Sequence, residues 1–199
     1  MKQDIQKYIG ELRDTAIDAQ LNYEVWWTYE ERESRQKYVD TMNHYTTFFW
    51  TSIHAHFLAM LVALYRLYET RPDTVNIPHF IKILEENACI PQVAISKVRQ
   101  IYQEARPLWV KVSILRNEAF AHRSNEYNVS EVFQRAGVTP DELKDLVERT
   151  KKLLNEITHV WNRNVDAFNL RAADDTTRLL EDLKQLWETR SNTGVGPTS

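Results

Sequence analysis

The scarcity of glycine constrains this chain more than any other feature of its sequence. Only four of its 199 residues are glycine, and only Gly137 lies between Glu11 and Thr193. Sandwiches and barrels need frequent tight turns, which draw on glycine and on Asn-Gly or Asp-Gly pairs, and neither pair occurs here. Glycine-rich phosphate loops of the Walker or dinucleotide type are excluded for the same reason. The sequence therefore predicts an all-α protein.

Length and composition fit an ordinary folded domain. Hydrophobic residues make up 43% of the chain and charged residues 27%, which is typical of globular proteins. We expect a single domain over residues 1–190 and a disordered tail over residues 191–199, which are rich in Gly, Ser and Thr. The single cysteine, Cys89, excludes an internal disulfide and a cysteine-based zinc site. Since the N-terminus also lacks an apolar leader, we expect a cytoplasmic protein.

The most apolar stretch of the chain runs from Phe48 to Leu67 and contains a single formal charge, Arg66. Its strictly apolar part, Phe57 to Leu64, is much shorter than the roughly 20 residues that a membrane span needs. We therefore expect a buried central helix and no contact with a membrane.

Periodicity and boundary signals predict the order of the helices. The expected long helices cover about 1–32, 38–70, 92–122 and 140–170, and the shorter ones 79–87, 129–136 and 174–190. Pro107 predicts a kink or a break inside its helix. Gly137 is the expected left-handed cap of the helix before it, and Thr139 and Glu142 are expected to form a capping box around Pro140.

The chemically informative segment is residues 115–124, with the sequence LRNEAFAHRS. Arg116 is followed by Asn117, and His122 lies six positions after the arginine, at the end of an amphipathic helix. This pattern resembles the R-x4–6-H motif of HEPN domains, and the residues in and around it are most similar to the AbiU2-type branch of abortive-infection proteins. The resemblance implies an antiparallel helical bundle with two long N-terminal helices and additional C-terminal helices.

Catalytically competent HEPN proteins are metal-independent ribonucleases, so the resemblance implies an endoribonuclease without cofactor or metal. Attack of a ribose 2′-hydroxyl on the adjacent phosphate needs a proton acceptor, a proton donor and positive charge on the phosphorane. By resemblance, His122 is the general acid or base, Arg116 stabilises the phosphate, and Asn117 orients a partner or holds the backbone. Lys111 and Arg123 are the expected substrate contacts. The targets tRNA, mRNA and invading transcripts all stay open.

The spacing of the motif favours a homodimer. At about 100° per residue, positions six apart lie roughly 120° apart around a helix, so Arg116 and His122 do not share one face. In the HEPN family, two protomers pack motif helix against motif helix, and the two pairs of residues meet in one cleft. An isologous contact would do the same here. The resemblance also implies a regulatory partner, such as an antitoxin.

The charge of the chain is uneven along its length. The formal net charge is −3, yet residues 97–123 hold six basic and only two acidic residues, and the rest of the chain is correspondingly acidic. This distribution argues against a broad nucleic-acid surface and allows one small site around the motif.

Other interpretations of the same residues stay open. Arg116 and His122 could simply complement the dipole of the helix end, and His122 could pair with Glu118 four residues before it. The alternatives are a non-catalytic HEPN module that binds RNA or a protein, and an unrelated helical bundle with a chance motif.

Two further groups of residues have the chemistry of a metal site or of a base-stacking site. His54 and His56 point to different helical faces and are not expected to bind one metal ion. Trp26 and Trp27 could stack on bases, although core or interface packing is the commoner use of such residues.

Overall fold

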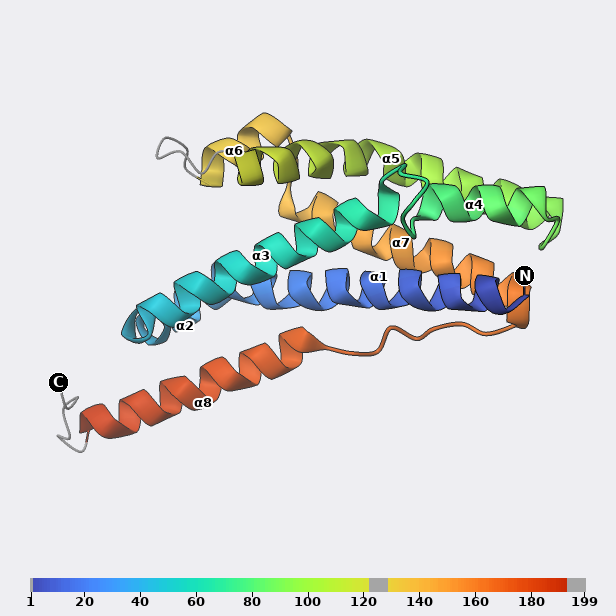
Figure 1. Cartoon of the computed structure of the whole chain (residues 1–199). Helices are drawn as coiled ribbons and strands as arrows, with labels where there is room; N and C mark the ends of the chain where they lie inside the picture. The colour runs from blue at the N-terminus through green and yellow to red at the C-terminus, as the bar shows by residue number, and fades with distance from the viewer. Residues whose placement is uncertain (1, 122–128, 193–199) are drawn as a thin grey trace. The chain divides into compact units, whose positions relative to one another are not determined.

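The computed structural model describes residues 2–121 and 129–192, which fold into eight α-helices without a strand (Figure 1). The helices are α1 (Lys2–Glu30), α2 (Arg32–His44), α3 (Thr46–Tyr68), α4 (Ile77–Glu86), α5 (Gln92–Ala121), α6 (Val129–Ala136), α7 (Pro140–Asn162) and α8 (Ala172–Asn192). The predicted all-α bundle is confirmed.

The helices form two compact units. The first contains the described parts of residues 1–20 and 58–169, and the second those of 21–57 and 170–199. Helices α1 and α3 therefore each contribute one part to each unit. The expected single domain over residues 1–190 stays a prediction. Of the expected tail, Ser191 and Asn192 belong to α8, and residues 193–199 lie outside the described residues.

In the first unit, α5 and α7 run antiparallel and share the most extensive helix contact (Figure 1). Their buried residues recur at spacings of three and four, which is the heptad pattern of helices that pack along a seam. On α5 these are Ala94, Val98, Ile101, Ala105, Val112 and Leu115, and on α7 Leu143, Val147, Thr150, Leu154 and Ile157.

A ladder of three ion pairs fixes how α5 and α7 align. The pairs are Lys97–Glu156 (2.7 Å), Glu104–Arg149 (2.8 Å) and Lys111–Glu142 (2.5 Å). From one pair to the next, both partners shift by seven residues in opposite directions, as an antiparallel register requires. The sign of the charge alternates along each helix. A slip by one heptad would therefore bring like charges together, so the ladder selects the register.

Aromatic residues of α1, α3 and α4 make further contacts between helices of the first unit. Tyr68 of α3 is fully buried, and its hydroxyl lies 2.8 Å from the hydroxyl of Thr150 on α7. Burial raises the pKa of Tyr68, because the charged phenolate would lose its hydration. On α1, Tyr8 stacks against Phe80 of α4 with ring centroids 5.2 Å apart.

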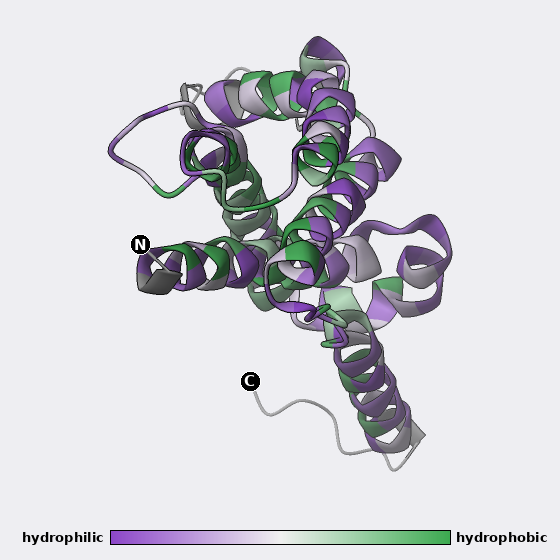
Figure 2. Cartoon of the chain, turned by 90° about the vertical axis from the view of Figure 1, so that its right-hand side faces the viewer, coloured by the Kyte–Doolittle hydropathy of each residue, from purple (hydrophilic) through white to green (hydrophobic). Residues whose placement is uncertain are grey.

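The second unit has an aromatic cluster of its own. Tyr29, Tyr38, Met42 and Phe49 pack together with Leu180 of α8. The Tyr38 hydroxyl donates a hydrogen bond of 2.6 Å to Glu181, which also pairs with Lys37. Most of α8 is polar, and the helix that leads to the C-terminus is largely purple in Figure 2. Its attachment in this unit therefore depends on a few apolar residues.

Among the described residues, α3 is the one helix whose length and composition would suffice to cross a membrane. Its second half carries the longest apolar run, and there Met60, Leu61, Leu64 and Leu67 are completely buried. That face packs against protein, but only 33% of the most apolar window of α3 is buried, so the expectation of a buried helix without membrane contact stays a prediction. The first half of α3 exposes Trp50 and Phe48.

The long helix expected over residues 38–70 is divided in two. Helix α2 ends at His44, Tyr45 leaves the helical region with φ −118° and ψ 42°, and α3 begins at Thr46. The Thr46 hydroxyl donates to the carbonyl of Asn43 at 2.5 Å, so a side chain takes a backbone acceptor at the junction. The charged residues near position 31 form the junction between α1 and α2, with Glu31 as the N-cap of α2.

Pro107 was expected to cause either a kink or a break in its helix, and the break does not occur. Helix α5 continues from Gln92 to Ala121 with Pro107 inside it. Proline removes one backbone hydrogen bond, but Ala105 and Val112 on either side are completely buried. Packing on both sides of the proline therefore holds the helix together.

Helix α7 ends eight residues earlier than the sequence analysis predicted. Arg163 adopts a left-handed conformation with φ 60° and donates its N–H to the carbonyl of His159. The Asn162 side chain then accepts the N–H of Asn164 at 3.0 Å. Short polar side chains that bond to nearby backbone compete with the helix, and this signal was missed. The predicted capping box at Thr139 and the left-handed Gly137 (φ 59°) are confirmed.

Candidate functional site

Arg116 lies in the last turns of α5 with its side chain half-buried. Its guanidinium carbon is 4.6 Å from the ring centroid of Tyr65 on α3, which is the geometry of a cation–π contact. The Tyr65 ring in turn lies 6.3 Å from that of Trp109, centroid to centroid. An aromatic platform made of Tyr65 and Trp109 therefore supports the arginine of the motif.

The platform has one unsatisfied polar atom. The indole Nε1 of Trp109 is buried and has no hydrogen-bond partner among the described residues. Leaving a buried donor unpaired costs roughly 1–3 kcal/mol. Val112 and Leu115 on the same helix are completely buried, and their packing holds this part of α5 in place. This packing offsets the cost of the unpaired Nε1 of Trp109.

Tyr65 and Trp109 were not predicted from the sequence to be part of the site. One signal was available, because Trp109 precedes Arg116 by seven residues and so lies on the same face of the helix. No comparable signal pointed to Tyr65, which comes from a distant part of the chain.

Asn117 is exposed and directly contacts the motif arginine. Its Oδ1 accepts a hydrogen bond of 3.0 Å from Nη1 of Arg116. The structure therefore brings together Arg116 and Asn117, two of the residues predicted to be catalytic by resemblance to the motif. The bond gives Asn117 a means of holding the guanidinium in one orientation.

Lys111 is engaged in an ion pair, which limits its freedom to bind a substrate. Its ammonium lies 2.5 Å from Glu142, the residue that completes the capping box of α7. This contact with Lys111 lowers the pKa of the Glu142 carboxyl. A substrate phosphate would have to compete with that carboxylate, and the role of Lys111 stays a prediction.

Two other cations of the basic stretch are compensated in the same way. Lys97 pairs with Glu156, and Arg99 forms a bidentate ion pair with Glu85. Carboxylates of α4 and α7 thus offset positive charges of α5. A sum of charges over residues 97–123 alone does not include these carboxylates. The positive potential around the motif is therefore smaller than the sequence analysis inferred from residues 97–123.

His122 and Arg123, the other two predicted site residues, lie outside the described residues. The described part of the site is therefore Arg116, Asn117 and the aromatic platform. The roles of His122 and Arg123 stay predictions from the motif.

An exposed stripe borders the motif along α5. Pro107, Val110 and Ile114 lie at spacings of three and four, in line with Asn117. Val110 and Ile114 retain 44% and 41% of their surface. Two branched apolar residues on the face that carries Asn117 form a suitable contact for another helix.

The remaining candidate residues belong to the second unit. His56 bonds to Asn22 at 2.8 Å, and burial lowers its pKa, whereas His54 stacks on Trp50. Within the described parts of the chain, no group of three or more His, Cys, Asp or Glu is arranged to hold a metal ion. Trp26 is buried, as core packing requires, and Trp27 is half-buried.

The family model of the AbiU2-type HEPN domains matches residues 2–190. The chain belongs to this family. No curated protein and no solved structure matches it. The AbiU2 match covers nearly the whole chain, so the resemblance first seen in residues 115–124 is confirmed at the level of the family. This AbiU2 chain is accordingly an abortive-infection-related HEPN domain.

Proposed function

We propose that this protein is a metal-independent endoribonuclease whose active site is completed by a second copy of the chain. The observation that carries the proposal is the ordered Arg116, held against Tyr65 and bonded to Asn117 at the start of the R-x5-H motif. An arginine whose direction is fixed loses little entropy when it binds a phosphate. Family membership supplies the class of reaction.

The proposed chemistry is an internal transfer at phosphorus. The 2′-hydroxyl attacks the adjacent phosphate and gives up its proton to one His122, while the 5′-oxygen leaves and takes a proton from the other. The products are a 2′,3′-cyclic phosphate and a 5′-hydroxyl end. Arg116 of each protomer forks onto the non-bridging oxygens, whose negative charge grows in the transition state.

The exposed stripe on α5 supports the second copy. In a two-fold dimer, Val110 and Ile114 of one protomer would meet the same residues of the other. Because Asn117 continues the stripe and Arg116 is its neighbour, such a contact brings the two motifs close together. Each active site would then combine residues from both chains.

The decisive experiment incubates the purified full-length chain with RNA in the presence of EDTA. We expect cleavage that leaves 2′,3′-cyclic phosphates and that falls at least about 100-fold in Arg116→Ala, the loss typical when a transition-state donor is removed. Arg178→Ala is the matched control, because this exposed arginine of α8 has only a 3.9 Å contact with Asp175. Equal activity of the two variants would contradict the proposal.

The ion pairs of Lys97, Arg99 and Lys111 favour a second candidate function, a HEPN module that binds RNA or a protein without cleaving it. Paired cations contribute less to a phosphate path than free ones. If the wild type cleaves no RNA but binds it, and Arg116→Ala weakens this binding, the module is the correct assignment.

A further inference from the structure

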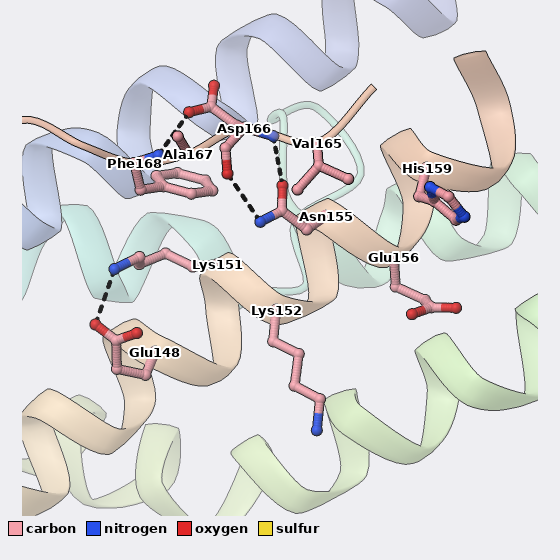
Figure 3. A pocket seen from close by; sticks show the side chains of 10 residues that line it. All are labelled: Glu148, Lys151, Lys152, Asn155, Glu156, His159, Val165, Asp166, Ala167 and Phe168. Carbon is pink, nitrogen blue, oxygen red and sulfur yellow. Dashed lines mark hydrogen bonds and ion pairs between the residues drawn. The ribbon is translucent and has the colours of Figure 1, made fainter. Parts of the chain in front are cut away.

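A pocket of about 500 Å³ lies away from the motif, between residues 148–159 of α7 and the segment 165–168 (Figure 3). We call it the α7 pocket. Pockets of roughly 300–1,000 Å³ commonly hold small molecules. Glu156, one of its lining residues, pairs with Lys97, which precedes Arg116 by nineteen residues on the same helix. At 1.5 Å per residue this is about 28 Å along α5, so the α7 pocket is separate from the proposed active site.

Side-chain hydrogen bonds fix the wall opposite α7. The Asn155 amide donates to the carbonyl of Asp166 at 3.0 Å and accepts the N–H of the same residue at 2.8 Å. The Asp166 carboxylate accepts the N–H of Phe168 at 2.9 Å, and the Phe168 ring is buried. Because these hydrogen bonds join residues of the chain itself, they fix this wall of the pocket, and binding need not order it.

The carboxylates that line the pocket are compensated by their neighbours. Glu148 accepts from Lys151 at 2.9 Å, and Glu156 pairs with Lys97 at 2.7 Å. Asp166 already accepts a backbone N–H and lies 3.6 Å from Arg13. The acidic residues therefore contribute little net negative charge to the pocket.

Two potential donors in the pocket are left without such partners. Among the described residues, the side chains of Lys152 and His159 form no ion pair and no hydrogen bond. In Figure 3 the ammonium of Lys152 stands apart from the drawn carboxylates, and His159 lies near the end of α7. The two are seven residues apart on one helical face, so about 10 Å separates them along the axis.

The opposite wall is apolar. Val165 retains 62% of its surface, and Ala167 beside it is also exposed. A ligand of this pocket thus meets a free ammonium, an imidazole about 10 Å away and an apolar surface. Such a set suits a small molecule with an anionic end and a flat ring with polar edges.

We propose that the α7 pocket binds a nucleoside monophosphate. The phosphate contacts Lys152, one face of the base lies against Val165 and Ala167, and an edge of the base hydrogen-bonds to His159. This site does not depend on the proposed ribonuclease activity, because it uses none of the motif residues.

The test is calorimetric titration of the full-length chain with AMP, adenosine and inorganic phosphate. We expect AMP to bind more tightly than either fragment, and Lys152→Gln to weaken AMP at least tenfold. Lys144→Gln is the matched control, since Lys144 is an exposed lysine of α7 outside the pocket. His159→Leu should weaken AMP and leave the weaker binding of phosphate unchanged.

The absence of AMP binding at millimolar concentration would overturn this proposal. Equal binding of AMP and adenosine would overturn it as well, and so would an equal loss in Lys152→Gln and Lys144→Gln. Arg116→Ala separates the two sites, because it should abolish RNA cleavage and leave AMP binding intact. Loss of AMP binding in Arg116→Ala would assign the nucleotide to the motif and reject the α7 pocket.

Discussion

The guanidinium of Arg116 lies 4.6 Å from the ring centroid of Tyr65, and this contact sets the direction of the motif arginine. The partner comes from α3, about fifty residues earlier in the chain. An aromatic face attracts a cation through its quadrupole and still leaves the N–H groups at the edge of the guanidinium available to bond. Asn117 already uses one of them. The platform can therefore orient Arg116 without neutralising its charge.

This relationship predicts opposite results for two substitutions of Tyr65. Tyr65→Phe keeps the ring and should retain RNA cleavage within about twofold, whereas Tyr65→Leu removes the quadrupole and should lower kcat about tenfold. The expected energy is the roughly 0.5–2 kcal/mol of a cation–π contact. Steady-state kinetics on a short RNA would measure both. A purely structural role would instead lower the melting temperature of Tyr65→Leu and leave the kcat of its folded fraction unchanged.

The helix order was predictable because it depends on local signals. The capping box at Thr139 and the left-handed Gly137 each depend on only three or four consecutive residues, and both were predicted at the correct positions. The breaks at Tyr45 and Arg163 were missed. Each arises where side chains such as Thr46 or Asn162 bond to nearby backbone, and such residues also occur inside helices.

The site was predictable only where it follows one helix. Arg116 and Asn117 were chosen from the motif and are neighbours in sequence, and the structure shows a hydrogen bond between them. The support from Tyr65 and the neutralisation of Lys111 by Glu142 are tertiary contacts, and a count of charges along α5 does not contain them. For this reason the sequence overstated the positive charge around the motif.

The exposed stripe on α5 predicts a way to separate the protomers. Ile114→Glu would place two carboxylates against each other across an isologous contact, and like charges in such a position oppose association. We expect a monomer by sedimentation at micromolar concentration and a loss of RNA cleavage. Leu179→Glu is the control, because Leu179 of α8 is similarly exposed, at 43% against 41%. A dimer that survives Ile114→Glu would contradict the proposed interface.

The ion-pair ladder predicts a charge-reversal rescue. Lys97→Glu faces Glu156 and should lower the free energy of unfolding by up to about 1 kcal/mol, since exposed pairs contribute little each. The double variant Lys97→Glu, Glu156→Lys restores an opposite pair and should recover most of the loss. Urea unfolding of the wild type, both single variants and the double variant completes the cycle. Additive effects would show that the pair does not couple α5 to α7.

The contact of Lys111 with Glu142 predicts how stability changes in acid. Because Lys111 lowers the folded-state pKa of Glu142, the carboxylate stabilises the folded chain above its unfolded pKa, which is near 4.5. This stabilisation is lost as the pH falls through the lower, folded-state value. Lys111→Met removes the cause of the shift. We therefore expect Lys111→Met to unfold at a lower temperature than the wild type at pH 7, with the gap closing toward pH 3.

The control for this experiment is Lys144→Met on α7. Lys144 is exposed and is not among the causes of the lowered pKa of Glu142. Its melting curve should follow the wild type at both pH values. A gap between Lys111→Met and the wild type that is equal at pH 7 and pH 3 would show that Lys111 stabilises α7 through its methylene groups and not through the charge of Glu142.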